Sequence, residues 1–157
     1  MRTGLFTSPY LITFEERIRV DGANISADGL TEETLLVKEQ AEAMADHPTE
    51  FELMCAVALV HFARSGCDIV VLEVGLGGRL DSTNVIDAPE VAVVARIGLD
   101  HTKLLGTTLA AIAAEKAYGI KISNNARIIR NILEGAQFLH SHILWFYNLA
   151  ALDYVNP

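Results

Sequence analysis

Hydrophobic residues gather in short runs along the chain, each of strand length and each bounded by turn residues. Three of these runs cover residues 3–7, 68–74 and 91–97. Such runs are typical of central strands in a parallel sheet whose two faces are covered by helices. Residues 16–26 instead alternate around Asp21-Gly22, which predicts a small extended excursion with a turn at that pair.

The segments between these runs have features typical of helices. A helix is predicted from Thr31, as its N-cap, to about residue 45, because acidic residues follow in the first turn. A clearer helix begins at Thr49, which can form a capping box with Glu52, and ends at Gly66. Helices that alternate with buried strands predict the α/β fold class.

The sequence changes character after about residue 121. Before that point, apolar spacing predicts a third helix over residues 107–117. Beyond it, residues 122–157 form a tail of unknown character, in which a weak apolar pattern over 126–152 is compatible with a helix. We therefore expect one domain over residues 1–121, followed by this tail.

Length and composition exclude several classes of protein. A chain of 157 residues, 51% hydrophobic and 20% charged, is long and apolar enough for one globular domain. The net charge of −8 argues against a general nucleic-acid binder, which would carry a basic surface. The apolar stretches are too short for a membrane span, no secretory signal is expected, and two reduced cysteines favour a cytoplasmic protein.

Three polar residues stand where predicted strands end. Glu73 closes the strand over 68–74, His101 follows the strand over 91–97, and Ser8 follows the first strand. If the two longer strands are parallel neighbours, Glu73 and His101 converge on the edge where α/β proteins bind ligands. They could hold a divalent cation there, although Mg²⁺ seldom takes an imidazole ligand. The simpler interpretations are that Glu73 forms an ion pair in a loop, that His101 is a surface histidine and that Ser8 is an ordinary turn residue.

Lys116 lies on the apolar stripe of the helix predicted over residues 107–117. A lysine in that place can extend its amine to solvent near the helix C-terminus, where the dipole favours a cation. It can also be partly buried with a lowered pKa, and then act as a nucleophile or be modified. The spacing alone leaves both readings open.

The glycine cluster after Glu73 does not match the common cofactor loops. A dinucleotide fingerprint needs glycine where Leu80 stands, and an S-adenosylmethionine-type loop needs glycine where Arg79 stands. A methyltransferase-like cofactor-binding domain is therefore a minor alternative. No Gly-x-x-x-x-Gly-Lys-Ser/Thr phosphate loop occurs within these 157 residues.

Six ordered motifs resemble the folylpolyglutamate synthase and dihydrofolate synthase family, which belongs to the Mur ligase superfamily. The resemblance covers residues 2–117. The motifs are TSPYL (7–11) with FEERI (14–18), PTEFE (48–52), EVGLGGRLDSTN (73–84), IGLDH (97–101), LGTT (105–108) and IAAEKA (112–117).

This resemblance implies a mostly parallel, helix-flanked, Mur-ligase-like P-loop domain, of which residues 1–121 are the part that follows the phosphate-loop segment. It implies a ligase that transfers the γ-phosphoryl of ATP to a carboxylate of folate or dihydropteroate, after which L-glutamate attacks the acyl phosphate. Ser8, Glu73 and His101 would be the Mg²⁺ ligands. Lys116, which would be carbamylated, and His101 are the implied catalytic residues.

Two segments match those that line the family's pterin site. They are Thr49, Glu50, Phe51 and Glu52, and Leu80, Asp81 and Ser82. The chain departs from the family at Tyr10, where histidine is usual, and after Lys121. We expect an interior piece of the ATPase domain, from a monomeric enzyme, that does not catalyse alone; a non-catalytic truncated remnant is the alternative.

Overall fold

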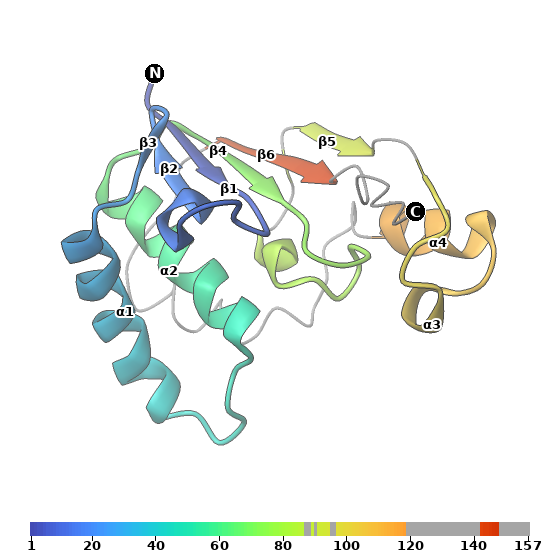
Figure 1. Cartoon of the computed structure of the whole chain (residues 1–157), viewed down its shortest axis with the longest axis horizontal. Helices are drawn as coiled ribbons and strands as arrows, with labels where there is room; N and C mark the ends of the chain where they lie inside the picture. The colour runs from blue at the N-terminus through green and yellow to red at the C-terminus, as the bar shows by residue number, and fades with distance from the viewer. Residues whose placement is uncertain (87–88, 90, 95–96, 119–141, 148–157) are drawn as a thin grey trace.

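The computed structural model describes residues 1–86, 89, 91–94, 97–118 and 142–147. A six-stranded sheet runs through its centre in the order β3-β2-β1-β4-β6-β5 (Figure 1). The strands are β1 (Thr3–Phe6), β2 (Ile18–Val20), β3 (Ala23–Asn24), β4 (Ile69–Glu73), β5 (Val91–Val94) and β6 (His142–Tyr147).

The sheet is mixed, with a parallel centre and one antiparallel edge. β1, β4, β6 and β5 pair in parallel, and the register places Phe6 opposite Leu72. β2 and β3 add an antiparallel hairpin beside β1. Its turn lies at Asp21 and Gly22, as predicted, with φ angles of 52° and 83°. The α/β class is confirmed, and the parallel arrangement holds for four of the six strands.

β6 lies between β4 and β5 and pairs with both. The strands that precede Glu73 and His101 are therefore parallel but not neighbours, so the adjacency on which their convergence depended is not found. Residues 142–147 are a strand and not part of a helix over 126–152; the rest of that range lies outside the described residues. Their sequence, HILWFY, is rich in the branched and aromatic residues that suit a strand.

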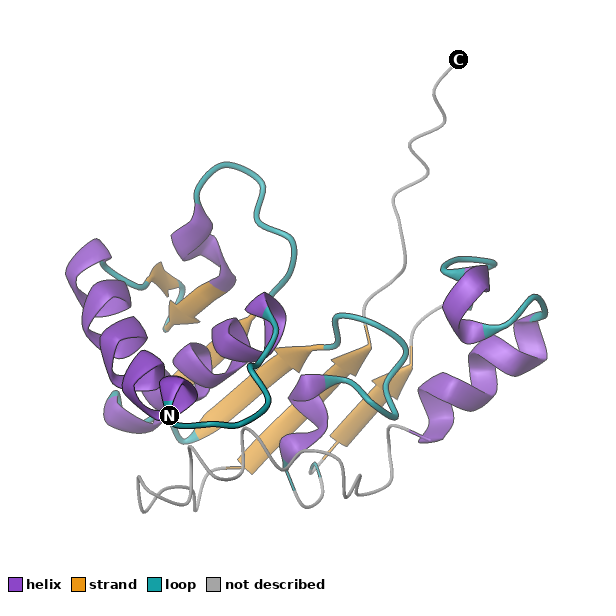
Figure 2. Cartoon of the chain, turned by 90° about the horizontal axis from the view of Figure 1, so that it is seen from below, coloured by secondary structure: helices purple, strands orange, loops and turns teal. Residues whose placement is uncertain are grey.

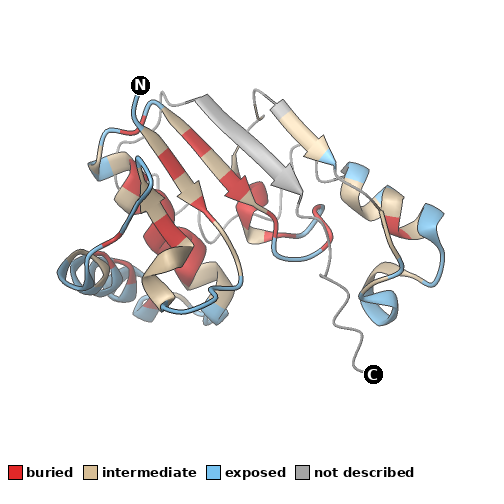
Figure 3. Cartoon of the chain, turned by 45° about the horizontal axis from the view of Figure 1, so that its top comes forward, coloured by how far each residue is buried: buried red, intermediate tan, exposed pale blue. Residues whose placement is uncertain are grey.

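Helix α2 (Glu50–Arg64) packs against β1 and is covered in turn by α1 (Ala27–Glu42) (Figures 1 and 2). The middle of α2 is apolar on all sides, as expected of a helix enclosed by other elements. Gly4 lets α2 approach, because a Cβ atom there would lie 2.7 Å from the Phe62 ring. Figure 3 shows buried residues on α2 and on strands β1 and β4, and these residues belong to one hydrophobic core. Its largest buried side chains include Phe6, Phe62, Ile18, Leu59 and Leu72.

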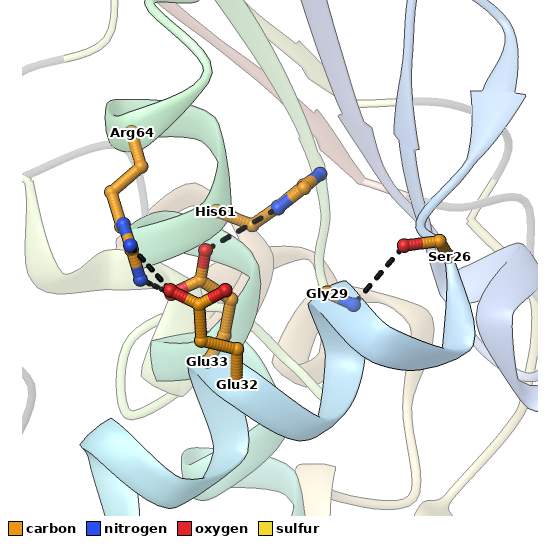
Figure 4. A network of polar contacts seen from close by, with 6 residues as sticks. All are labelled: Ser26, Gly29, Glu32, Glu33, His61 and Arg64. Atoms are coloured by element: carbon orange, nitrogen blue, oxygen red, sulfur yellow. Dashed lines mark hydrogen bonds and ion pairs between the residues drawn. The ribbon is translucent and has the colours of Figure 1, made fainter.

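Helix α1 begins earlier than the sequence pattern indicates. Its N-cap is Ser26, whose hydroxyl accepts a hydrogen bond from the Gly29 N–H at 3.0 Å (Figure 4). Thr31 lies inside the helix and donates its hydroxyl to the Ala27 carbonyl at 2.8 Å, so the predicted cap at Thr31 is wrong. Gly29 lies in the first turn of α1, and glycine is a poor helix former. The helix propensity of this turn is therefore low, and the sequence pattern does not indicate it.

Charged side chains join α1 to α2 at the rim of the core (Figure 4). Glu33 is buried, and its carboxylate accepts from Arg64 Nη1 at 2.9 Å and lies 3.6 Å from His61 Nδ1. Arg64 also contacts Glu32 through Nη2 at 2.5 Å. A buried carboxylate with these partners fixes how α1 sits on α2.

The remaining helices lie beyond the parallel strands. The short 3₁₀ helices η1 (Phe14–Arg17) and η2 (Ser82–Val85) follow β1 and β4, and α3 (Thr102–Leu105) and α4 (Leu109–Tyr118) follow β5. α3 and α4 lie on the far side of β5 from α1 and α2 (Figures 1 and 2). α4 confirms the helix predicted over 107–117, whereas α3 was not predicted. No described helix has both the length and the apolar character that a membrane crossing requires.

Candidate functional site

The candidate site begins where β1 and β4 end. Because these strands pair in parallel, the residues that follow them meet at one edge of the sheet. The backbone N–H of Ser8 donates a hydrogen bond to Glu73 Oε2 at 2.6 Å. The structure thus brings together two of the three predicted metal ligands.

The carboxylate of Glu73 is half-buried at this edge. Burial raises its pKa above the ordinary value, and the hydrogen bond from Ser8 works in the opposite direction. Among the described residues, no basic side chain contributes to the shift in pKa. A carboxylate held in this way, without a cationic side chain, is suited to binding an external cation.

Asp81 organises the glycine-rich loop that follows Glu73. Its Oδ2 accepts from the backbone N–H groups of Gly75, at 3.1 Å, and Leu76, at 2.8 Å. Its Oδ1 accepts from the Thr83 N–H at 2.9 Å and from the Thr83 hydroxyl at 2.5 Å. Burial raises the pKa of Asp81, and these four hydrogen bonds oppose that rise. The structure shows that Asp81 holds the loop in shape, and its predicted role in lining a ligand site stays a prediction.

The loop packs directly on the N-terminal turn of α2. A Cβ atom on Gly75 would lie 2.5 Å from Phe51 Cζ, so the aromatic ring rests on the bare backbone of the loop. The Phe51 ring also packs against Phe6, with 5.8 Å between ring centroids. The structure therefore brings the two predicted pterin-site segments to the same edge as Glu73.

Two of the predicted pterin-site residues cap α2. The Glu52 carboxylate accepts from the Thr49 N–H at 2.7 Å, and the Thr49 hydroxyl accepts from the Glu52 N–H at 3.4 Å. This reciprocal capping box confirms the predicted start of α2. Glu50 and Leu80 are exposed, and Ser82 begins η2.

His101 lies in an exposed turn just before α3. Its φ angle is 48°, and its backbone N–H donates to Asp100 Oδ1 at 2.7 Å. Its imidazole Nε2 lies 3.6 Å from Asp100 Oδ2. Within the described part of the chain, no cluster of three or more His, Cys, Asp or Glu residues is arranged to hold a metal ion. The predicted ligand role of His101 stays a prediction.

Lys116 is half-buried near the C-terminal end of α4. Burial lowers its pKa, while the negative charges of Asp100 and Asp81 oppose that change. This burial agrees with the partly buried lysine that was one of the two readings of the sequence.

Sequence reasoning missed the role of Arg79 and part of the role of Asp81. Arg79 Nε and Nη2 each lie 3.2 Å from an oxygen of the Glu115 carboxylate on α4. Nothing in the local sequence links these two residues, because they come from separate elements. A signal did exist for Asp81, since an aspartate two residues before Thr83 is typical of a side chain that accepts from the backbone ahead of it.

Most of the chain is similar in sequence to dihydrofolate synthases and folylpolyglutamate synthases. It is 48% identical over 123 residues to the dihydrofolate synthase/folylpolyglutamate synthase of Bacillus subtilis, an alignment that covers 75% of this chain and 28% of that protein. A folylpolyglutamate synthase of Arabidopsis thaliana is 46% identical over 120 residues, with 74% and 19% covered. The chain thus spans less than a third of the length of these two relatives.

Solved structures give the same result. A folylpolyglutamate synthase described as an FPGS-AMPPCP-folate complex matches with a TM-score of 0.70 and 34% identity, covering 92% of this chain and 38% of that one. The Escherichia coli FolC structure in complex with DHPP and ADP matches with a TM-score of 0.69 and 31% identity, covering 97% and 38%. At these identities both the fold and the sequence are similar.

A different family matches the C-terminal part. The model of a family described as nickel-dependent hydrogenase matches residues 104–157, about a third of the chain. This span includes α4 and β6 and contains no cysteine, so the matched sequence offers no thiolate for a metal. The match overlaps the tail that the sequence sets apart at residue 122.

Proposed function

Because the chain belongs to the folylpolyglutamate synthase/dihydrofolate synthase family over about three-quarters of its length, we propose that it is part of an ATP-dependent ligase. This ligase joins L-glutamate to a folate, to dihydropteroate or to both. The observation that carries the proposal is 48% identity over 123 residues to a dihydrofolate synthase/folylpolyglutamate synthase. The family-like motifs of this chain contain Ser8, Glu73, His101 and Lys116.

The reaction proceeds through an acyl phosphate. A carboxylate oxygen of the folate or pteroate attacks the γ-phosphorus of ATP, and ADP leaves. The amine of glutamate then attacks the acyl carbon, loses a proton and displaces inorganic phosphate, which leaves an amide. Transfer of this kind asks the protein chiefly for positioning and for neutralisation of charge. The whole protein performs it, and the described residues supply one edge of the site.

Mg²⁺ is the metal that the family implies, and the donors at this edge suit it. Glu73 and Ser8 offer carboxylate and hydroxyl oxygens from adjacent strand ends, and Mg²⁺ prefers oxygen ligands. His101 is the third proposed ligand. When bound, the ion supplies charge neutralisation at the phosphates.

Lys116 is proposed to be carbamylated. A partly buried amine is more often neutral, and a neutral amine can attack CO₂ to give a carbamate once it loses a proton. The modification converts a cation into an anionic oxygen ligand. Phe51, Leu80, Ser82 and the backbone at Gly75 are proposed to face the pterin ring, since an aromatic wall such as Phe51 suits a flat ring.

Ligand binding by the chain itself tests this proposal. Titration with dihydropteroate and with folate, followed by ligand fluorescence, is expected to show saturable binding that Phe51→Leu weakens several-fold. Phe14→Leu, at a half-buried aromatic in η1, is the matched control and should bind normally. A folded chain that binds neither ligand would instead favour the non-catalytic alternative. Release of ADP that depends on glutamate then reports whether these residues suffice for catalysis.

A further inference from the structure

The glycine-rich loop after β4 is fastened to the arm formed by α3 and α4. Arg79, in the loop, and Glu115, in α4, form an ion pair with two parallel contacts, Nε to Oε2 and Nη2 to Oε1, each 3.2 Å long. This two-pronged geometry fixes direction as well as distance, because the guanidinium and the carboxylate are both planar.

A second contact between the loop and the arm lies nearby. Gly77 has a φ angle of +67°, and a Cβ atom at that position would lie 2.9 Å from Leu105 Cδ2. Glycine adopts this conformation without strain, and any side chain at this position would require Leu105, which ends α3, to move. The loop therefore touches both helices of the arm.

The backbone around Arg79 is itself held in place. The side-chain amide of Asn84 donates to the carbonyl oxygens of Gly78, at 3.3 Å, and Arg79, at 3.2 Å. On the other side of the loop, Asp81 accepts from Gly75 and Leu76. The backbone that carries the Arg79 side chain is therefore held in place while the guanidinium contacts Glu115.

Lys116 directly follows Glu115 in α4, so a contact that holds the Glu115 side chain also restrains the turn of α4 that carries Lys116. We propose that Arg79 is a positioning residue, whose ion pair with Glu115 holds α4 against the glycine-rich loop and so fixes the place of Lys116. A catalytic importance of the position of Lys116 rests on the proposed function. The claim that Arg79 fixes this position does not.

Acetylation of lysines in the intact chain, followed by peptide mass spectrometry, measures the placement without any ligand. Arg79→Ala should raise the acetylation rate at Lys116 by about two- to fivefold, the range that an exposed ion pair of ordinary strength provides. Arg79→Lys keeps the charge but loses the second contact. The acetylation rate at Lys116 in this variant should therefore fall between the rates in the wild type and in Arg79→Ala. The exchanged pair Arg79→Glu with Glu115→Arg should return the rate towards that of the wild type.

Two controls separate this effect from general loosening. Arg2→Ala breaks another exposed ion pair, between Arg2 Nε and Asp21 Oδ2 at 3.3 Å, and should leave Lys116 unchanged. The rate at exposed Lys38 on α1 should be the same in every variant. If Arg79→Ala fails to fold, Glu115→Gln removes the same pair with almost no change of shape.

An unchanged rate at Lys116 in Arg79→Ala, or in Glu115→Gln, overturns the proposal. So does failure of the exchanged pair to restore the rate. Absence of pterin or ATP binding would count against the proposed ligase function and leave the acetylation result standing, so the two failures are distinguishable.

Discussion

Glu73 Oε2 and the backbone nitrogen of Ser8 lie 2.6 Å apart, and this hydrogen bond joins the ends of two parallel strands. The acceptor is a half-buried carboxylate whose pKa is raised by burial. An ionised group in that place costs stability unless a ligand compensates it. The chain thus carries a carboxylate where a neutral acceptor would serve the fold equally well.

Glu73→Gln should therefore stabilise the chain slightly at neutral pH. The glutamine carbonyl can still accept from Ser8, while the cost of burying a charge disappears. We expect a gain in the free energy of unfolding below ~1 kcal/mol, since solvent screens a half-buried group. Urea unfolding at pH 7, compared with the exposed control Glu42→Gln, measures the change.

The pH dependence of that gain has a definite sign. The pKa of Glu73 is higher in the folded chain than its ordinary value of 4.5, so its contribution to stability is fully present below pH 4.5. That contribution is lost as the pH rises through the raised pKa. The advantage of Glu73→Gln should accordingly vanish below pH 4.5 and reach a plateau above the raised pKa. A variant that is less stable than wild type at pH 7 would contradict this reading.

Asp81→Asn should destabilise the chain. All four of its hydrogen bonds are accepted by the carboxylate, and an asparagine amide would turn a donor towards either the Gly75 and Leu76 N–H groups or Thr83. Leaving such donors unpaired costs roughly 1–3 kcal/mol. Asp46→Asn, at an exposed position, is the control for denaturant unfolding and should change little. Equal stabilities of the two variants would show that Asp81 does not hold the loop.

Gly75→Ala should displace the Phe51 ring. The added Cβ would lie 2.5 Å from Phe51 Cζ, and overpacking of this kind costs about 1–3 kcal/mol. Combining it with Phe51→Leu should recover part of the loss, which a double-mutant cycle of unfolding free energies will show as coupling. Gly98→Ala, where no atom of the described residues lies within 4 Å of the added Cβ, should be tolerated. Additive effects of the two substitutions would rule out the contact.

Arg64→Met should loosen α1. It leaves the buried Glu33 carboxylate with His61 alone, at a cost of about 1–3 kcal/mol, below the range for fully buried pairs because Arg64 is partly exposed. Adding Glu33→Gln should recover stability by removing the stranded charge. Lys38→Met, which breaks an exposed pair of Lys38 and Glu42 at 3.5 Å, should have almost no effect. Thermal unfolding of the three variants, compared with the wild type, decides between these outcomes.

Features encoded by neighbouring residues were predictable from the sequence. The capping box at Thr49, the turn at Asp21 and the strand that ends at Glu73 each depend on a few consecutive residues, and all three are confirmed. The edge shared by Ser8 and Glu73 followed from the general rule for parallel strands.

Features that depend on distant partners were not predictable. No pattern in the sequence indicates that Arg79 pairs with Glu115, because each residue resembles an ordinary surface charge in its own segment. Placing β6 between β4 and β5 required knowing which strands meet. The start of α1 was also not predicted. Gly29 follows the capping residue Ser26 closely and lowers the helix propensity of the first turn.

The place of β6 in the sheet also sets an order of assembly. β1 and β4 can pair as soon as both have been synthesised. Among the described strands, β5 pairs with β6 alone, which the ribosome makes much later (Figure 1). Pairing between strands so far apart along the chain is slow to form. Until it forms, β4 presents an open edge to other chains. Premature association during synthesis would therefore begin at β4, and a chaperone that shields this edge would raise the yield of folded chains.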